Sequence, residues 1–172
     1  MKKLLTCMTM IAAMAMMMVS CSKDDDKDTP AQRLEFANKL TMNGTTATWE
    51  GTDQRQYKEL GNWVNKSQSY VVIRFDRNST TDTQGTGVVL TFQNSYKEDF
   101  KERSEFTWNF NNDQLHIDYR RSGWQPVYAE YRTNELIINN SGFKGYWFES
   151  TDTRYQFSYI KSNFTDWDKY KD

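Results

Sequence analysis

The feature that most constrains the fold of this chain is the alternation of apolar and polar residues from position 45 onward. In FTWNFNNDQLHIDY, residues 106–119, two alternating runs flank the polar stretch NNDQ. Strict alternation sends successive side chains to opposite faces of a strand, a spacing that a helix does not have. A polar turn between two such runs is typical of a β-hairpin. The segment therefore predicts two paired antiparallel strands.

The rest of the chain repeats this pattern in short runs joined by polar connections. Such a series is typical of an antiparallel meander. Because eight meandering strands leave two sheet edges open unless they close, we predict an all-β fold, an eight- to nine-stranded antiparallel up-and-down barrel. A β-sandwich meander is the alternative. The expected strands cover residues 46–54, 69–76, 87–93, 105–110, 115–120, 127–131, 136–138, 143–149 and 155–159.

One short helix is expected before the first strand. Leu34, Ala37 and Leu40 have helical spacing, and Pro30 stands where a first helical turn tolerates proline. The following Asn-Gly pair ends the pattern. We therefore predict an amphipathic helix at 31–40.

Aromatic side chains dominate the apolar content of the expected strands. The 172-residue chain has 10 Phe, 10 Tyr and 6 Trp. The interior of an eight-stranded barrel is just wide enough to be filled by side chains or to hold one small ligand. We expect a filled interior, with a small apolar ligand as the alternative. The residues expected to point inward and to line such a ligand are Phe75, Phe92, Trp108, Phe110, Trp147 and Phe157.

The first 20 residues have the layout of a secretory signal peptide. Lys2 and Lys3 give a positive start, an uncharged run of about 16 residues ends at Val19, and Ser20 precedes Cys21. The run is shorter than the roughly 20 apolar residues of a membrane-spanning helix, so an uncleaved anchor is the weaker alternative. The stretch MVSC resembles a bacterial lipoprotein signal. The resemblance implies cleavage before Cys21, a diacylglyceryl thioether on its sulfur and an acyl chain such as palmitate on its new amino terminus.

Cleavage at this point divides the chain into three parts. They are a signal peptide (1–20), the lipidated Cys21 with a charged tether (21–30), and a single β domain (31–172). Loss of the two signal-peptide lysines leaves 20 basic against 23 acidic residues. This balance shows no basic face, so we expect no nucleic-acid partner. Because Cys7 leaves with the signal, the domain has no thiol for a disulfide, a metal or a nucleophile.

Four motifs occur in order along the expected strands: TWEGT (48–52), VIRFDRN (72–78), FTWNFNNDQLHIDY (106–119) and YAEYRTNELIINN (128–140). Together they resemble the lipocalin-like domains of Bacteroidetes lipoproteins. The family implies an eight-stranded closed or half-open barrel at the outer membrane. The lipocalin signature has Gly two residues before Trp, whereas this chain has Ala47 there and Gly51 two residues after Trp49. We therefore transfer the fold and the location, but no ligand.

The stretch SKDDDKD at 22–28 resembles the acidic export signal that sends Bacteroidetes lipoproteins to the outside of the outer membrane. The resemblance implies a protein held in the membrane by the lipid on Cys21 and facing the cell exterior. The alternative is a solvated tether, because the stretch is too poor in apolar groups to fold.

Patterns for catalysis and metal binding are weak. His116 is the only histidine, and its strand phase points it to the polar face, which disfavours nucleophilic machinery and a histidine metal site. The loop 76–82 has oxygen-bearing side chains but lacks the Gly and Glu of a calcium loop. Carboxylates that could pair for glycoside cleavage do not occupy inward strand positions; they are Glu98, Asp99, Glu102, Glu105, Asp166 and Asp168. We predict no catalytic, cofactor-binding or metal-binding residue.

Some strands are apolar on both faces, for example at 71–73 and 88–90. One face of a barrel strand normally meets water, so we expect the helix at 31–40 to cover part of the outer face and a protein partner or second copy to cover the rest. Trp63 and Trp124 lie in connections. They either plug a barrel end or form a surface contact with a sugar ring or a protein.

These observations predict a lipid-anchored binding or accessory protein of the cell envelope, without catalytic activity, that presents a β-barrel to a protein or a ligand. The alternatives are a carrier of a small apolar ligand, a glycan-binding module and, in a different class, a hydrolase of the cell surface.

Overall fold

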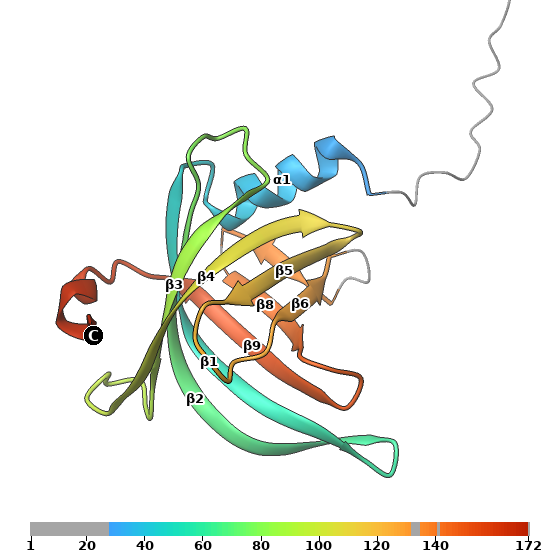
Figure 1. Ribbon diagram of the computed structural model, residues 1–172, viewed down its shortest axis with the longest axis vertical. Helices are drawn as coiled ribbons and strands as arrows, with labels where there is room; N and C mark the ends of the chain where they lie inside the picture. The colour runs from blue at the N-terminus through green and yellow to red at the C-terminus, as the bar shows by residue number, and fades with distance from the viewer. Residues whose placement is uncertain (1–27, 132–134, 141, 172) are drawn as a thin grey trace, which may run out of the picture.

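The computed structural model of the protein describes residues 28–131, 135–140 and 142–171 (Figure 1). The predicted signal peptide, Cys21 and most of the tether lie outside these residues. These described residues form one α-helix, nine strands and one 3₁₀ helix. They are α1 (Pro30–Leu40), β1 (Thr46–Glu59), β2 (Asn62–Asp76), β3 (Gln84–Phe92), β4 (Phe100–Asn111), β5 (Gln114–Tyr119), β6 (Val127–Glu130), β7 (Ile137–Asn139), β8 (Gly142–Phe148), β9 (Thr153–Lys161) and η1 (Asp166–Tyr170).

The strands form a closed antiparallel barrel in an up-and-down order. Neighbours run β6-β5-β4-β3-β2-β1-β9-β8, and β6 pairs with β8 at Tyr128 and Phe148, which closes the barrel with eight strands. The extra strand, β7, pairs with the start of β8, where Ile138 lies opposite Phe143. The predicted all-β barrel with one short N-terminal helix is confirmed.

The hairpin β1–β2 is longer than the alternation predicted. Its turn residues Leu60 and Gly61 have φ of 50° and 84°, the left-handed values that suit a two-residue hairpin turn. The pairing continues to Glu59 and Asn62. Apart from Tyr57, Trp63 and Val64, the residues of this extension are polar on both faces, so no apolar alternation marks it in the sequence. Trp63, expected in a connection, therefore lies within β2.

Helix α1 closes one end of the barrel (Figure 1). Thr29 caps it, because the Thr29 hydroxyl accepts from the Gln32 amide and the Gln32 side chain accepts from the Thr29 amide. Ala37 and Leu40 are fully buried. The indole Nε1 of Trp49 donates to the Leu40 carbonyl oxygen at 2.9 Å. The helix thus covers a barrel end rather than the outer strand faces that it was expected to cover.

Beneath α1, aromatic rings fill the barrel. Phe75 meets Phe106 and Phe143 edge to face, with ring centroids 5.4 and 6.0 Å apart, a geometry that aromatic quadrupoles favour. Trp108 donates from its indole to the Thr86 carbonyl at 2.9 Å. At this end, the expectation of an interior filled by side chains is confirmed.

A second apolar cluster lies outside the barrel. Val72, Val88, Leu90 and Phe92 face away from the interior and pack against the C-terminal segment, defined here as residues 162–171. The contacting side chains of that segment are Phe164, Trp167 and Tyr170. The apolar outer face of β2 and β3 is therefore covered by the chain itself, where the sequence suggested a partner (Figure 1).

Candidate functional site

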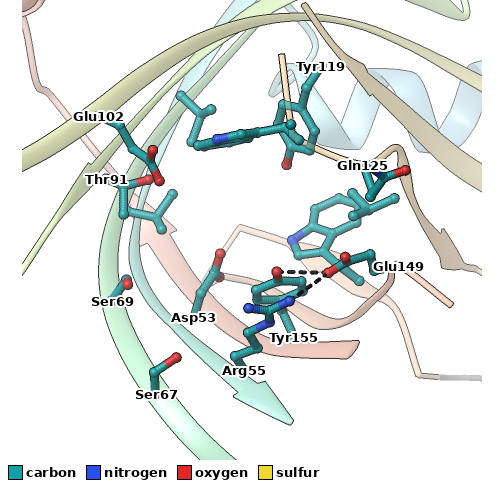
Figure 2. A pocket seen from close by; sticks show the side chains of 16 residues that line it. Asp53, Arg55, Ser67, Ser69, Thr91, Glu102, Tyr119, Gln125, Glu149 and Tyr155 are labelled. Carbon is teal, nitrogen blue, oxygen red and sulfur yellow. Dashed lines mark hydrogen bonds and ion pairs between the residues drawn. The ribbon is translucent and has the colours of Figure 1, made fainter. Parts of the chain in front are cut away.

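The end of the barrel opposite α1 is hollow. It holds a half-open chamber of about 310 Å³, shown in Figure 2. Its wall comes from the ends of the strands that lie farthest from α1 and from the β5–β6 connection. The lining residues are Asp53, Arg55, Ser67, Ser69, Val71, Val89, Thr91, Glu102, Tyr119, Gly123, Trp124, Gln125, Val127, Trp147, Glu149 and Tyr155. All the labelled side chains in Figure 2 carry oxygen or nitrogen, and three valines and two tryptophans complete the wall, so polar groups converge among apolar and aromatic ones.

Strand β1 supplies the two charged residues at the base of the chamber. Trp49 and Gly51 precede Asp53 and Arg55 at every second position, and the pleat of a strand sends all four toward the interior. Trp49 packs in the core under α1, whereas Asp53 and Arg55 reach the hollow end. The same strand therefore contributes an apolar side chain to the filled end of the barrel and polar side chains to the wall of the chamber.

Asp53 is held by a chain of buried donors. The Tyr159 hydroxyl donates to Asp53 Oδ1 at 2.5 Å, and the Trp147 indole donates to the Tyr159 oxygen at 3.4 Å. Burial raises the pKa of Asp53 to about 7, although the hydrogen bond from Tyr159 lowers it. Burial, together with the nearby Asp53 carboxyl, raises the pKa of the Tyr119 and Tyr159 hydroxyls, so both remain protonated at neutral pH.

Glu149 is the centre of a second cluster. Its Oε2 accepts from the Tyr155 hydroxyl at 2.9 Å and pairs with Arg55 Nη2 at 3.5 Å, as the dashed lines in Figure 2 mark. The Arg55 guanidinium also lies 4.8 Å from the ring centroid of Tyr57 and 5.5 Å from that of Tyr155. Its Nε is buried and has no hydrogen-bond partner among the described residues.

Glu102 lies on the opposite wall, beside Thr91 (Figure 2). It has the strand phase of Ser104 and Phe106, both of which are buried. The expectation that Glu102 occupies an outward position is therefore wrong, because the mixed-charge composition of 96–105 conceals that phase. Arg121 Nη2 pairs with Glu102 at 3.7 Å, at the mouth of the chamber.

The residues expected to line a ligand separate into three groups. Phe75, Trp108, Phe110 and Phe157 lie in the aromatic core, and Trp147 alone reaches the chamber wall. Phe92 faces outward and packs on Tyr170 at 5.3 Å between ring centroids. Phe92 has the strand phase of Val88 and Leu90, which also face outward, so its neighbour Thr91 faces the chamber instead.

The two tryptophans expected at the surface differ in position. Trp124 lines the chamber and meets Tyr119 edge to face, with centroids 4.7 Å apart. Trp63 lies on the hairpin β1–β2, where the Arg154 guanidinium sits 4.2 Å from its ring centroid and 4.0 Å from that of Tyr146. Only Trp124 therefore belongs to the chamber.

Asp53, Arg55, Glu149 and Tyr155 were not identified from the sequence as a site. The inward orientation of Asp53 and Arg55 could have been counted from Trp49, because they follow it by two and three of the two-residue repeats of the strand. Glu149 lies just past the end of β8, and Tyr155 shares the phase of the buried Phe157. Their convergence depends on barrel closure, which no local pattern encodes.

Among the described residues, no three His, Cys, Asp or Glu side chains gather closely enough to hold a metal ion. In the loop that faintly matched a calcium site, the Asp82 carboxylate accepts from the Ser79 amide at 2.9 Å. Within the same described ranges, no helix combines the length and apolarity needed to cross a membrane.

No family model matches this chain, and no curated protein matches it either.

Proposed function

We propose that this protein is a non-catalytic binding protein of the cell envelope that takes a small polar ligand into the chamber. The observation that carries the proposal is the chamber itself, a hollow of about 310 Å³ in a barrel that is otherwise filled. If the barrel had no ligand to bind, apolar side chains could fill this end, as they fill the end beneath α1. Specific sites of this kind are concave, with a few polar groups among aromatic walls.

The lining favours a polar ligand over the apolar one suggested by the aromatic composition. Charged groups face the hollow from β1, β4 and the end of β8, and Ser69, Thr91 and Gln125 add neutral hydrogen-bonding groups. An apolar ligand would displace the water that hydrogen-bonds to these groups and would offer no hydrogen bonds in return. The aromatic walls, Trp124 and Trp147, also suit the flat face of a sugar ring.

A ligand contact is favoured over a protein contact as the main role. The apolar strand faces that suggested a protein partner are covered in part by residues 164–170. What remains to be explained is the polar hollow.

The proposal includes a lipid anchor at Cys21, in the outer membrane and facing the exterior. The tether between Cys21 and α1, called here the N-terminal arm, meets the barrel at its closed end, where Arg33 pairs with Asp28 at 2.6 Å and the Tyr131 hydroxyl donates to Asp28. Six residues lie between Cys21 and Asp28, so the two are at most about 25 Å apart along an extended chain. An anchored barrel would thus sit close to the membrane with its chamber mouth pointing away. Labelled palmitate should enter the wild type and not Cys21→Ala.

The binding test uses native mass spectrometry and Trp fluorescence with panels of amines, alcohols, carboxylates and oligosaccharides. Ser69→Trp places a large side chain in the chamber and should abolish binding. Gln68→Trp, at the adjacent and exposed position, should retain it. Binding that survives Ser69→Trp, or the absence of any binding to wild type, would overturn the proposal.

A second candidate function, glycoside hydrolysis, is favoured by one observation. A carboxyl with a raised pKa, Asp53, shares a chamber with the carboxyls of Glu102 and Glu149, and hydrolysis of this kind needs an acid and a second carboxylate. Turnover of p-nitrophenyl glycosides that is lost in both Asp53→Asn and Glu149→Gln would establish it and refute the non-catalytic assignment.

A further inference from the structure

The acidic groups of the chamber differ in how their charge is compensated. Glu149 has Arg55 and the Tyr155 hydroxyl, and Glu102 has Arg121. Among the described residues, Asp53 has neither an Arg nor a Lys within ion-pair distance. Its one hydrogen-bond partner there is the Tyr159 hydroxyl, on Oδ1. The chamber therefore contains a carboxyl group that lacks a counter-ion.

This carboxyl points into the hollow. Figure 2 shows the Asp53 side chain directed toward the space between Tyr119 above it and the pair Tyr155–Glu149 beside it. A carboxylate without a counter-ion is costly to enclose in a protein, and proteins normally pair such a group or leave it protonated. A site that keeps it facing an open cavity is complementary to a positively charged group placed there.

The neighbouring walls fit the same charge. Trp124, Trp147, Tyr119 and Tyr155 present rings around the hollow, and the faces of such rings attract cations within about 6 Å of the centroid. Arg55 already uses this attraction, with its guanidinium 5.5 Å from the Tyr155 centroid. A carboxylate below and aromatic rings around it are the two elements that recognise an ammonium group.

We propose that the ligand of the chamber is a small organic cation, with a protonated amine that pairs with Asp53 and an apolar or aromatic body that packs between Trp124 and Trp147. This inference rests on the proposed binding function and specifies its ligand class.

The proposal predicts a dependence on pH. Burial raises the pKa of Asp53 to about 7, so protons compete with the cation below that pH. Three tyrosine hydroxyls face Asp53 or its chamber and remain protonated because their pKa values are raised; they belong to Tyr119, Tyr155 and Tyr159. Arg55, Glu102 and Glu149 also line the chamber. Amine affinity should therefore fall by about tenfold for each pH unit below about 7.

The experiment compares three probes of similar shape by isothermal titration calorimetry: phenethylamine, 2-phenylethanol and phenylacetate. At pH 8 the amine should bind the wild type at least about tenfold more tightly than the alcohol, and phenylacetate most weakly. Asp53→Asn should remove the amine's advantage over the alcohol. Asp118→Asn, which removes an exposed carboxylate from the outer face of β5, is the matched control and should leave that advantage intact.

Two outcomes separate this inference from the function on which it rests. If the alcohol, phenylacetate or a sugar binds as tightly as the amine, and Ser69→Trp abolishes that binding, the cation assignment is refuted while the binding function stands. If no probe binds and no member of the wider panel does, both fail. Should Asp53→Asn not fold, the wild-type comparison of amine and alcohol at pH 8 and pH 5.5 decides, because only the amine should weaken at pH 5.5.

Discussion

Asp53 is a residue at which binding and stability oppose each other. Burial raises the pKa of its carboxyl from 3.8 to about 7, against the effect of the Tyr159 hydrogen bond. Between these values the folded protein keeps a proton that the unfolded chain releases. Stability contributed by the protonated group is complete below pH 3.8 and is lost as the pH rises toward 7.

Replacing Asp53 with Asn should therefore stabilise the protein at pH 8. The amide still accepts from Tyr159 and never ionises. The gap of about three pH units corresponds to at most about 4 kcal/mol, at roughly 1.36 kcal/mol per unit. Urea unfolding should show Asp53→Asn above wild type at pH 8 and equal to it at pH 4. An equal difference at both pH values would contradict the assignment of a buried, titrating carboxyl.

Gly51 permits β1 and β9 to approach closely beside this site. A Cβ at position 51 would lie 2.0 Å from the Ser158 carbonyl oxygen and 2.9 Å from the Tyr159 Cα, both backbone atoms. The two strands would have to separate. We expect Gly51→Ala to lower the free energy of unfolding by about 2–3 kcal/mol. Gly44→Ala, whose nearest contact would be 3.4 Å, should change it far less in the same urea titration. Similar losses in both variants would be inconsistent with this close approach.

At the scale of elements, sequence patterns predicted the barrel strands and α1 well and the chamber poorly. Alternating apolar residues are the signal of a half-buried strand, and they mark β4 and β5 clearly. The outer half of hairpin β1–β2 has polar residues on both faces, so the pattern stopped at residue 54 and missed Arg55. The chamber-lining phase of Glu102 was obscured in the same way. A polar interior does not alternate, and therefore hydrophobic periodicity cannot detect it.

The C-terminal segment shows how an apolar outer face can be satisfied within the chain. Trp167 packs on the cluster of Val72, Val88, Leu90 and Phe92, and Arg74 lies 5.0 Å from its ring centroid. We expect Trp167→Ala to lower the free energy of unfolding by about 1–3 kcal/mol through lost apolar burial. The variant should also bind more of the dye 8-anilinonaphthalene-1-sulfonate, because the outer cluster becomes exposed. Tyr96→Ala, at an 80% exposed position, is the control, and an equal response from both variants would count against this packing role.

At the scale of the whole molecule, the two ends of the barrel have different tasks. The closed end contains α1, the aromatic core and the attachment of the N-terminal arm through Asp28. The open end contains the chamber and, beyond it, the tip of hairpin β1–β2 at the fully exposed Leu60. With 14 residues in β1, these ends are separated by up to about 45 Å. A lipid on Cys21 would therefore hold the closed end at the membrane.

This orientation can be measured with single thiols, since lipidation would block Cys21 and signal cleavage would remove Cys7. A fluorophore on Glu35→Cys in α1 should transfer energy to an acceptor in the vesicle membrane more efficiently than one on Leu60→Cys, because α1 adjoins the arm. Both side chains are exposed, so labelling should not disturb the core. Adding Cys21→Ala should abolish transfer from both positions. Equal transfer, or stronger transfer from Leu60→Cys, would mean that the chamber mouth faces the lipid, and its ligand would then have to arrive from the membrane surface.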